Sequence, residues 1–322
     1  VDSWNLEVRD SRTAPVYRAE GVRTLPGEAI VWNGIRNVPA AGTENRAVDG
    51  VYTAHLTVAF EKGNVAVAAT RPFAVDTAGP TIALRLPETL FSPDGDGIRD
   101  TLPIEITVND PSPVSGWTAV VRDPVGVEFW SRTGTRTVPR QIVWNGTSPG
   151  GELVQSSSRY TLGITAVDAY GNAGSADASI DTDVLVLRQG EELKIVLTSI
   201  NFAPFTADYL NVAPEIAAAN VATLDRAYDV LTRYPDYNIR IDGHAVSLLW
   251  ANPTRARTEQ QDVLIPLSRA RAEAIRRALI QRGIDGRRVT TQGLGGAFPV
   301  VPHSDEANRW KSRRVEFILE ER

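Results

Sequence analysis

An internal repeat spans the first two-thirds of the chain and constrains its fold more than any other feature. The stretch that begins Trp4-Asn-Leu-Glu-Val-Arg-Asp returns as Trp117-Thr-Ala-Val-Val-Arg-Asp, and each copy continues to a Val-Trp-Asn-Gly, at residues 31–34 and 143–146. Asn-Gly after an apolar residue indicates a tight turn, because both residues tolerate a positive φ. A repeated segment of this length predicts two successive modules of one fold.

Between these turns the apolar residues alternate as they do in β-strands. One such run places on a single face the side chains of Tyr52, Ala54, Leu56, Val58 and Phe60. No helical periodicity occurs before about residue 205, and short alternating strands at regular turn spacing are typical of β-sandwiches. The first two-thirds of the chain therefore predicts two all-β sandwich modules, at residues 1–79 and 80–187.

From about residue 188 the periodicity changes to that of an α/β domain. A strand at 193–202 is followed by a helix that begins at Pro214, and a second helix at 268–282 ends before Gly283, where a left-handed cap is expected. Further strands are expected around residues 239–241, 289 and 315–319. The resulting β-α-β-α-β-β order predicts helices packed on a small, partly parallel sheet, in a third domain at 188–322.

The composition excludes several classes of function. The chain has no Cys, only three His, and 34 Lys and Arg against 39 Asp and Glu. Thiol catalysis, a zinc centre and a nucleic-acid-binding surface are therefore not expected. No apolar run approaches the roughly 18 residues of a membrane-spanning helix. Because Met is absent even from position 1, we interpret the chain as processed, and we expect any membrane attachment to come from a removed N-terminal anchor.

Five short motifs occur in order in the last third of the chain. They are Ile-Asn-Phe at 200–202, Ile-Asp-Gly-His at 241–244, Leu-Ser-Arg-Ala-Arg-Ala at 267–272, Gly-Leu-Gly at 293–295 and Arg-Arg-Val-Glu-Phe at 313–317. In this combination the region resembles the OmpA-like, peptidoglycan-associating domain family. The resemblance implies a protein of the bacterial periplasm, associated with the outer membrane or the cell wall. It also implies a domain that binds the diaminopimelate of the cell-wall stem peptide without cleaving it, and hence a non-enzymatic protein.

The resemblance also implies where the ligand binds. In the family the Arg of the Leu-Ser-x-x-Arg-Ala motif, here Arg271, binds the ligand's carboxylate. We expect Arg271 in the first turn of a helix that begins near Ser268, where free N–H groups and a guanidinium suit an anion. Alternatively, Arg271 pairs with an internal carboxylate or extends into water. The candidate ligand-binding residues are Arg271, Ser268, His244, Asp262, Arg313 and Asn201.

Two departures from the family pattern concern the same site. Val246 stands where the family has the Asp that binds the ligand's ammonium group, and an aliphatic side chain accepts no hydrogen bond. Residues 247–266 form an insertion whose Asp262 is a candidate replacement carboxylate and whose Trp250 is expected either to bind a partner or to cover the groove. His244, which has no recognisable catalytic partner, is equally well explained as a hydrogen-bonded structural residue.

The two N-terminal modules resemble the Ig-like modules of bacterial envelope and flagellar-hook-assembly (FlgD-type) proteins. Their Trp-Asn-Gly and Asp-Gly-x-Tyr elements, the latter at residues 49–52, carry this resemblance. In the segment 91–100, Asp94, Asp96 and Asp100 have a spacing with which a turning loop can surround Ca²⁺. Alternatively, the segment is a glycine-rich turn solvated by its own Asp side chains. Apart from Ca²⁺ at this position, no cofactor is expected.

Together these features predict a multidomain protein, with two all-β Ig-like sandwich modules before an α/β OmpA-like domain. Its expected function is that of a non-enzymatic envelope scaffold, whose peptidoglycan site is lost or altered and which contacts another ligand or an envelope protein. The alternative is a peptidoglycan anchor that uses Arg271 and a substitute carboxylate. A cell-wall hydrolase is a more distant alternative, because no nucleophile is apparent.

Overall fold

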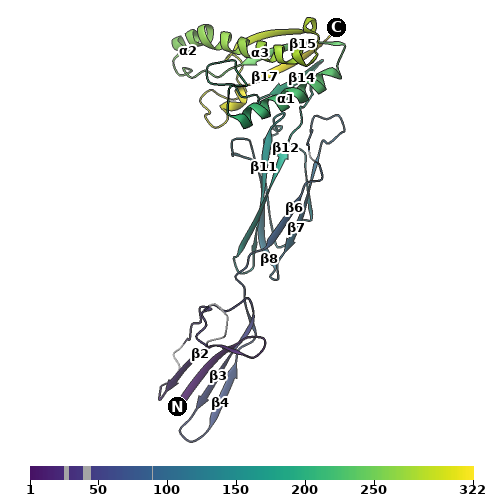
Figure 1. Ribbon diagram of the computed structural model, residues 1–322. Helices are drawn as coiled ribbons and strands as arrows, with labels where there is room; N and C mark the ends of the chain where they lie inside the picture. The colour runs from purple at the N-terminus through teal and green to yellow at the C-terminus, as the bar shows by residue number, and fades with distance from the viewer. Residues whose placement is uncertain (25–28, 39–44, 89) are drawn as a thin grey trace.

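The computed structural model describes residues 1–322 apart from 25–28, 39–44 and 89. The molecule is elongated and consists of three structural units in series (Figure 1). We call them the N-terminal sheet unit, the two-sheet unit and the α/β unit. No helix in the described ranges is long and apolar enough to cross a membrane.

The N-terminal sheet unit contains one five-stranded antiparallel sheet. Its strands are β1 (Ser3–Arg9), β2 (Pro15–Val22), β3 (Gly50–Ala59), β4 (Val65–Ala69) and β5 (Phe73–Val75). They lie in the order β2-β1-β3-β4, and β5 pairs with the first residues of β3. The buried core is small and consists of Val8, Val16, Ala47 and Tyr52, with Trp32 packed against it.

The two-sheet unit has a complete core between two antiparallel sheets. Its strands are β6 (Thr81–Arg85), β7 (Leu102–Asn109), β8 (Val114–Arg122), β9 (Glu128–Thr135), β10 (Gln141–Trp144), β11 (Arg159–Asp168) and β12 (Ala173–Asp181). One sheet has the order β10-β7-β6 and the other β12-β11-β8-β9. The repeated residues Trp117 and Trp144 are both buried in the core between them.

The repeat is visible in the strand pairing of the two units. The order β4-β3-β1-β2 corresponds to β12-β11-β8-β9. Trp4 lies opposite Gly21 on one neighbouring strand and Val58 on the other, as Trp117 lies opposite Gly134 and Ala166. The repeat therefore predicts equivalent sheets down to individual residue pairs.

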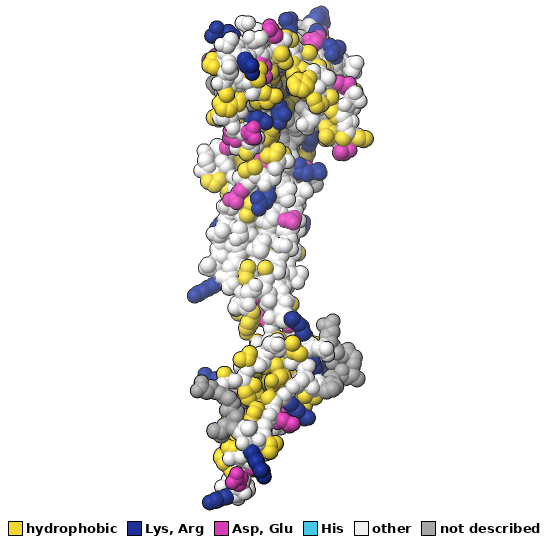
Figure 2. Space-filling model, turned by 90° about the vertical axis from the view of Figure 1, so that its left-hand side faces the viewer, with side chains coloured by type: hydrophobic (Ala, Val, Ile, Leu, Met, Phe, Trp, Pro, Cys, Tyr) yellow, Lys and Arg dark blue, Asp and Glu magenta, His cyan; other side chains and the backbone are white. Residues whose placement is uncertain are grey.

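The predicted sandwich of residues 1–79 is not found, because the described residues of this unit form a single sheet. In the two-sheet unit the core is covered by the second sheet, β10-β7-β6. Residues 29–32, which correspond in sequence to β10, form no strand. Ala54, Leu56 and Val58 are consequently only half-buried, and Figure 2 shows hydrophobic side chains exposed on this unit. The Ig-like character of the modules and their boundaries at 79/80 and 187/188 stay predictions.

The α/β unit has the predicted succession of strands and helices, with one short strand added before it. Its elements are β13 (Leu187–Gln189), β14 (Glu192–Leu197), α1 (Pro214–Thr232), β15 (Tyr237–His244), α2 (Pro253–Glu259), a π-helical turn (Gln260–Leu264), α3 (Ile265–Arg282), β16 (Val289–Gly295) and β17 (Val315–Glu321), with short 3-10 turns at Gly286–Arg288 and Arg309–Ser312. The sheet order is β13-β14-β17-β15-β16, in which only β15 and β16 are parallel. Leu224 of α1, Ile275 of α3 and Phe317 of β17 are buried in one core, so both helices pack on the same face of the sheet.

The second helix begins much earlier than the predicted Ser268. Asn252 caps the start of α2 by accepting a hydrogen bond from the Arg255 N–H (3.1 Å), and Pro253 occupies the first turn. The π-helical turn then joins α2 to α3, so the helical run is continuous to Arg282. Arg271 therefore lies inside a long helical segment, and the anion site expected from a helix N-terminus at Ser268 is wrong. The predicted cap at Gly283 is confirmed, with a φ of 116°.

Close polar contacts join the two-sheet unit to the α/β unit. Ser157 Oγ lies 2.9 Å from Thr223 Oγ1 of α1, and an Arg226 Nη2–H donates to the same Ser157 oxygen over 2.6 Å. Lys311 pairs with Glu152 at 2.6 Å. Because these contacts come from different parts of both units, they hold the two units in one relative orientation.

Candidate functional site

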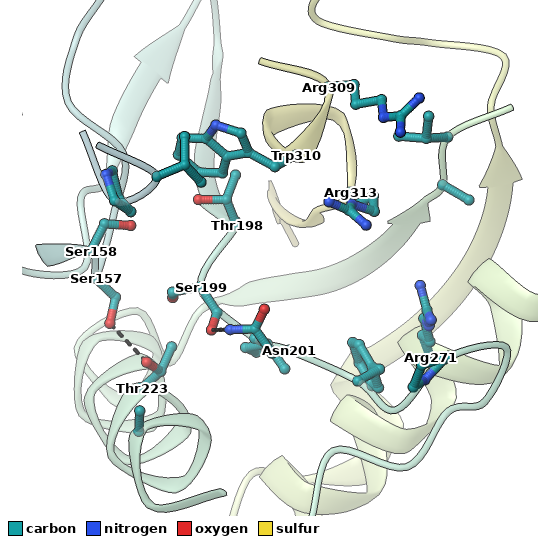
Figure 3. Close-up of a pocket in the computed structure, with 18 of the residues that line it drawn as sticks. Ser157, Ser158, Thr198, Ser199, Asn201, Thr223, Arg271, Arg309, Trp310 and Arg313 are labelled. Carbon is teal, nitrogen blue, oxygen red and sulfur yellow. Dashed lines mark hydrogen bonds between the residues drawn. The ribbon is translucent and has the colours of Figure 1, made fainter. Parts of the chain in front are cut away.

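An open cavity of about 1130 Å³ lies between the two-sheet unit and the α/β unit. The two-sheet unit contributes the β8–β9 loop and the start of β11 to the walls. The α/β unit contributes the segment after β14, α1, the helical run from the end of α2 to Arg271 of α3, and the last 3-10 turn. Figure 3 shows the side chains around it, with the serines of the two-sheet unit on one side and Arg271 on the other. A concave site between two units, with both apolar and polar walls, is a typical ligand-binding position.

Two arginines dominate the end of the cavity formed by the α/β unit. Arg271 of α3 donates its Nε–H to the Thr206 carbonyl over 2.9 Å, and its guanidinium carbon lies 4.8 Å from the centre of the Phe202 ring. Burial, and then the positive charge of Arg313, lower the pKa of Arg271. Neither Arg271 nor Arg313 forms an ion pair with any of the described acidic residues. Two neighbouring guanidiniums without a counter-ion suit a bound carboxylate.

Ser268 does not reach this cavity. Its side chain is fully buried, where it donates to the Ile265 carbonyl (3.1 Å) and accepts a hydrogen bond from the Gly295 N–H (3.0 Å). It therefore fastens α3 to the end of β16. The expectation that Ser268 binds ligand is wrong, because the helix does not begin there and its hydroxyl already has protein partners.

His244 also lies outside the cavity, in a buried ionic cluster on the sheet face that points away from the helices. Its Nε2 lies 3.5 Å from Glu316 Oε2, and Glu316 also contacts Arg314 (2.6 Å) and Lys194 (2.7 Å). Burial raises the pKa of Glu316, but His244, Lys194 and Arg314 outweigh this effect and hold the pKa below its ordinary value. The ligand-binding expectation for His244 is therefore wrong, and its buried ring lies in a structural ionic cluster, although neither ring nitrogen has a hydrogen-bond partner among the described residues.

The inserted segment contributes a different carboxylate from the expected one. Asp262 is exposed in the π-helical turn and does not line the cavity, whereas Glu259 does. Glu259 accepts hydrogen bonds from Ser247 Oγ (2.6 Å) and from the N–H groups of Leu248 and Leu249 (3.1 Å each). Burial raises the pKa of Glu259, but these hydrogen bonds more than compensate and lower it. The signal that sequence analysis missed is the Asn252-Pro253 helix start, which places Glu259 at the end of α2.

Other predicted residues do lie where the cavity is. Asn201 lines it, with its Nδ2–H donating to the Ser199 carbonyl over 3.0 Å (Figure 3). Val246, only 8% exposed, lies in the wall with Ala245. Trp250 is 46% exposed and does not line the cavity, so the cavity is not covered by it. Of the six expected ligand residues, Arg271, Arg313 and Asn201 are brought together here.

Sequence analysis confined the site to the last domain and missed the wall supplied by the two-sheet unit. Residues 124–125 and 157–159 line the cavity, as do Arg226 and Trp310 of the α/β unit. No local pattern in the sequence marks these positions, because they meet the rest of the site only through the contact between the two units.

The three Asp residues proposed for Ca²⁺ lie close together, with ligand atoms of Asp94, Asp96 and Asp100 within 4.8 Å of one another. Burial, with contributions from the charges of Asp96 and Asp100, raises the pKa of Asp94. The Asp100 carboxylate accepts hydrogen bonds from the N–H groups of Gly95 and Gly97 (2.8 Å each), as a self-solvated turn requires. Calcium binding here stays a prediction.

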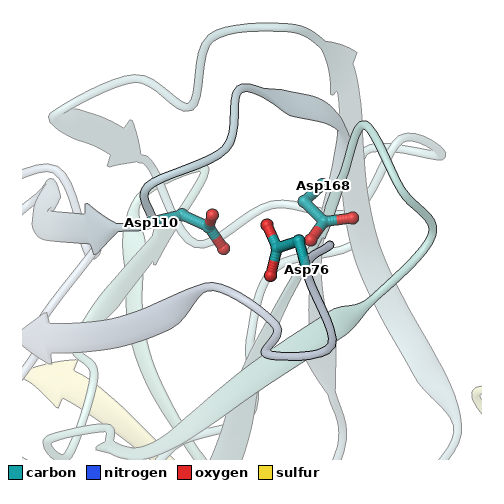
Figure 4. A group of neighbouring side chains, drawn as sticks. All are labelled: Asp76, Asp110 and Asp168. Atoms are coloured by element: carbon teal, nitrogen blue, oxygen red, sulfur yellow. The ribbon is translucent and has the colours of Figure 1, made fainter. Parts of the chain in front are cut away.

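A second acidic group, not anticipated from the sequence, lies where the N-terminal sheet unit meets the two-sheet unit. Asp76, Asp110 and Asp168 point toward one another in Figure 4, with ligand atoms within 4.8 Å. Each closes a local turn: Asp168 accepts from the N–H groups of Tyr170 and Asn172 (2.8 and 2.9 Å), and the other two accept from Ala78 and Ser112. Their hydrogen bonds account for the positions of all three side chains.

Comparison with known proteins identifies the α/β unit. Residues 213–313 match the OmpA family, so this unit carries an OmpA domain, as the sequence motifs predicted. The chain is 33% identical over 138 residues to "Probable lipoprotein YiaD" of Escherichia coli (strain K12), a match that covers 43% of this chain and 56% of that protein.

Two further relatives carry peptidoglycan in their names. The "Peptidoglycan-associated lipoprotein" of Rhizobium meliloti (strain 1021) is 35% identical over 104 residues, which cover 32% of this chain and 53% of that protein. "Peptidoglycan-binding protein ArfA" of Mycobacterium tuberculosis (strain ATCC 25618 / H37Rv) is 27% identical over 128 residues, or 40% of this chain and 36% of the relative. The matched regions thus span about half or less of the length of these relatives.

Proposed function

We propose that this chain is a non-enzymatic protein of the bacterial cell envelope whose OmpA domain holds a carboxylate of the peptidoglycan stem peptide in an altered site. Its place is the periplasm, at the outer membrane or the cell wall. Two relatives are named for association with or binding to peptidoglycan, which supports this ligand. No nucleophile with an activating base lines the cavity among the described residues, which supports binding without cleavage.

The observation that carries the proposal is that Arg271 and Arg313, two positive charges close enough to affect one another, both line the open cavity. Arg271 is half-buried and Arg313 is exposed. Neighbouring like charges repel one another, and an anion placed between them removes this repulsion. Each guanidinium can donate charge-assisted hydrogen bonds to a carboxylate. Losing one such contact costs about 1.5 to 3 kcal/mol, which corresponds to about tenfold to a hundredfold in affinity.

The site is altered where the ligand's ammonium group would be held. Val246 offers no acceptor, and the neighbouring wall residue Ala245 offers none from its side chain. In this proposal Glu259, rather than Asp262, is the substitute carboxylate, because it lines the same cavity and its lowered pKa keeps it ionised. Since Glu259 also holds the 247–249 segment, its contribution to binding an ammonium group is smaller than that of a free Asp.

Sedimentation with insoluble peptidoglycan tests the proposal. We expect the wild-type protein to sediment, and Arg271→Ala and Arg313→Ala to remain in the supernatant at the same concentration. Arg277→Ala is the matched control, because Arg277 is exposed on the same helix and does not line the cavity. Val246→Asp restores an acceptor and is expected to strengthen sedimentation. Release of soluble fragments from purified cell wall would contradict the non-enzymatic assignment.

A second function is favoured by the exposed inserted segment. Leu248, Leu249 and Trp250 are 56%, 43% and 46% exposed. Glu259 accepts hydrogen bonds from the N–H groups of Leu248 and Leu249 and so holds this part of the backbone in place. Such an apolar tip is a candidate contact for another envelope protein. A wild-type protein that stays in the supernatant, together with a Val246→Asp variant that sediments, would favour this scaffold function over the cell-wall anchor.

A further inference from the structure

The cavity has two ends that differ in chemistry, and Arg271 and Arg313 lie at one of them. In Figure 3 Ser157 and Ser158 of the two-sheet unit and Trp310 of the α/β unit lie on the side opposite Arg271. Hydroxyl groups are concentrated at this end, contributed by Ser157, Ser158, Thr182, Thr198, Ser199 and Thr223. One wall is thus built by residues that the OmpA domain itself does not contain.

Most charged groups at this end already have protein partners. Arg159 pairs with Asp181 at 2.7 Å, and an Arg226 N–H donates to Ser157 Oγ over 2.6 Å. Asp225 on the same stretch of α1 pairs with Arg282 at 2.7 Å. Arg226 has no carboxylate partner among the described residues, so this end offers a single unpaired guanidinium, against two at the arginine end.

Polar atoms at this end nevertheless lack hydrogen-bond partners in the described protein. They are Thr198 Oγ1, Ser199 Oγ, Arg226 Nε and Trp310 Nε1, and the Thr198 residue is only 8% exposed. Buried polar groups in folded proteins nearly always have a partner, so groups left over in a cavity wall are suited to a ligand's hydroxyls and amides. The indole of Trp310 adds a flat apolar surface beside them.

Hydroxyls, an indole and one guanidinium without a carboxylate partner are groups that a ring with hydroxyl and amide substituents can contact. We propose that the wall shared by the two-sheet unit and Trp310 is a second subsite, which holds an amino sugar of the glycan while Arg271 and Arg313 hold the stem peptide attached to it. This inference rests on the proposed peptidoglycan-binding function. It assigns to the two-sheet unit a direct part in ligand binding, beyond that of a spacer.

The junction is suited to such a shared site because it is already held together. Ser157 Oγ and Thr223 Oγ1 lie 2.9 Å apart, and Lys311, next to Trp310, pairs with Glu152 of the two-sheet unit at 2.6 Å. A subsite whose two walls are fixed before binding loses little conformational entropy when the ligand enters.

The experiment measures binding of two soluble compounds to the full chain by calorimetry. One is the diaminopimelate-containing tetrapeptide, and the other is the same peptide attached to the N-acetylglucosamine–N-acetylmuramic acid disaccharide. Val125→Trp enlarges a side chain in the wall of the two-sheet unit. Val127→Trp is the matched control on the same β8–β9 loop, because Val127 is also exposed but does not line the cavity. Both sites are exposed, so neither variant is expected to unfold the protein.

We expect the wild-type protein to bind the disaccharide peptide about tenfold more tightly than the free peptide, the order of magnitude of one or two added hydrogen bonds. Val125→Trp should remove this difference without changing the affinity for the free peptide, and Val127→Trp should keep it. Equal affinity of the wild-type protein for both compounds, or an unchanged difference in Val125→Trp, overturns the sugar subsite. Failure of the wild-type protein to bind the free peptide overturns the proposed function instead, so the two failures are distinguishable.

Discussion

The backbone oxygen of Ser268 lies so close to Gly243 that a Cβ at residue 243 would be 2.1 Å from it. Glycine is therefore required in β15 where helix α3 crosses the sheet. This close approach, together with the Ser268 hydroxyl bound to Gly295, sets the position of α3 and hence of Arg271 at the cavity. The short motifs of the sequence that contain Gly243 and Ser268 thus act partly through backbone packing.

Replacement of Gly243 by Ala should destabilise the α/β unit. The new methyl group would have to displace the backbone of α3, and overpacking of this kind costs about 1 to 3 kcal/mol. Thermal unfolding followed by circular dichroism measures the effect. Gly286→Ala is the control, because its new Cβ would meet the flexible end of Ile280 at 3.1 Å and should cost less. Equal melting temperatures for Gly243→Ala and wild type would contradict the close contact.

Arg313 and Arg314 are neighbours with opposite expected effects on stability and binding. Arg313→Ala removes a charge that disfavours the protonated form of Arg271, so it should leave the melting temperature unchanged or slightly raised while weakening peptidoglycan sedimentation. Arg314→Ala leaves Glu316 without one of its buried partners (2.6 Å). Removing one partner of a buried pair costs about 3 to 5 kcal/mol. A destabilised Arg313→Ala variant would show that this residue is structural.

Stability should fall in acid because of Glu316. The pKa of this carboxyl is lowered in the folded protein from its ordinary value of 4.5. A group with a lowered folded-state pKa contributes stability above its unfolded pKa and loses it as the pH falls toward the folded value. Urea unfolding at a series of pH values from 7 downward should therefore show a loss that begins near pH 4.5. In Glu316→Gln the stability at neutral pH should be lower and this part of the acid dependence should disappear, and an unchanged profile would contradict the assignment.

The N-terminal sheet unit should be less protected than the two-sheet unit that it repeats. Leu162, Ile164 and Ala166 of β11 are fully buried, whereas their counterparts on β3 are half-buried. Backbone hydrogen bonds of strands with few buried apolar contacts open more often than those of strands in a well-packed core. Hydrogen–deuterium exchange followed by mass spectrometry should show faster exchange in β1 and β3 than in β8 and β11. Equal protection in the two units would mean that the half-exposed face is covered in solution.

Calcium binding by Asp94, Asp96 and Asp100 is testable by adding Ca²⁺ or a chelator during thermal unfolding. A bound ion stabilises by an amount that grows with its concentration above the Kd. Asp96→Asn is the informative variant, because Asp96 is exposed and accepts only one turn hydrogen bond, from the Ile98 N–H. A melting temperature that is independent of Ca²⁺ in the wild-type protein would identify the segment as a self-solvated turn.

Much of the candidate site could be predicted from local sequence. The helical spacing after Pro214, the alternation in β15 and β17 and the glycine at 283 are each set by neighbouring residues, so they indicated the α/β unit before its structure was known. Arg271 could be identified because it lies within a short ordered motif. Ser268 and His244 belong to similar motifs, but their roles in packing and in an ionic cluster depend on partners far away in the chain.

The repeat, the order of strands and helices and the arginine that lines the cavity could be predicted from the amino-acid sequence, because periodicity and short motifs are local properties. Other features became apparent only from the packed molecule: Ser157 and Val125 of another unit complete the cavity wall, and Ser268 and His244 are buried away from it. These outcomes depend on contacts between residues far apart in the chain, which become neighbours only when whole units pack. No local pattern of side chains encodes such a contact.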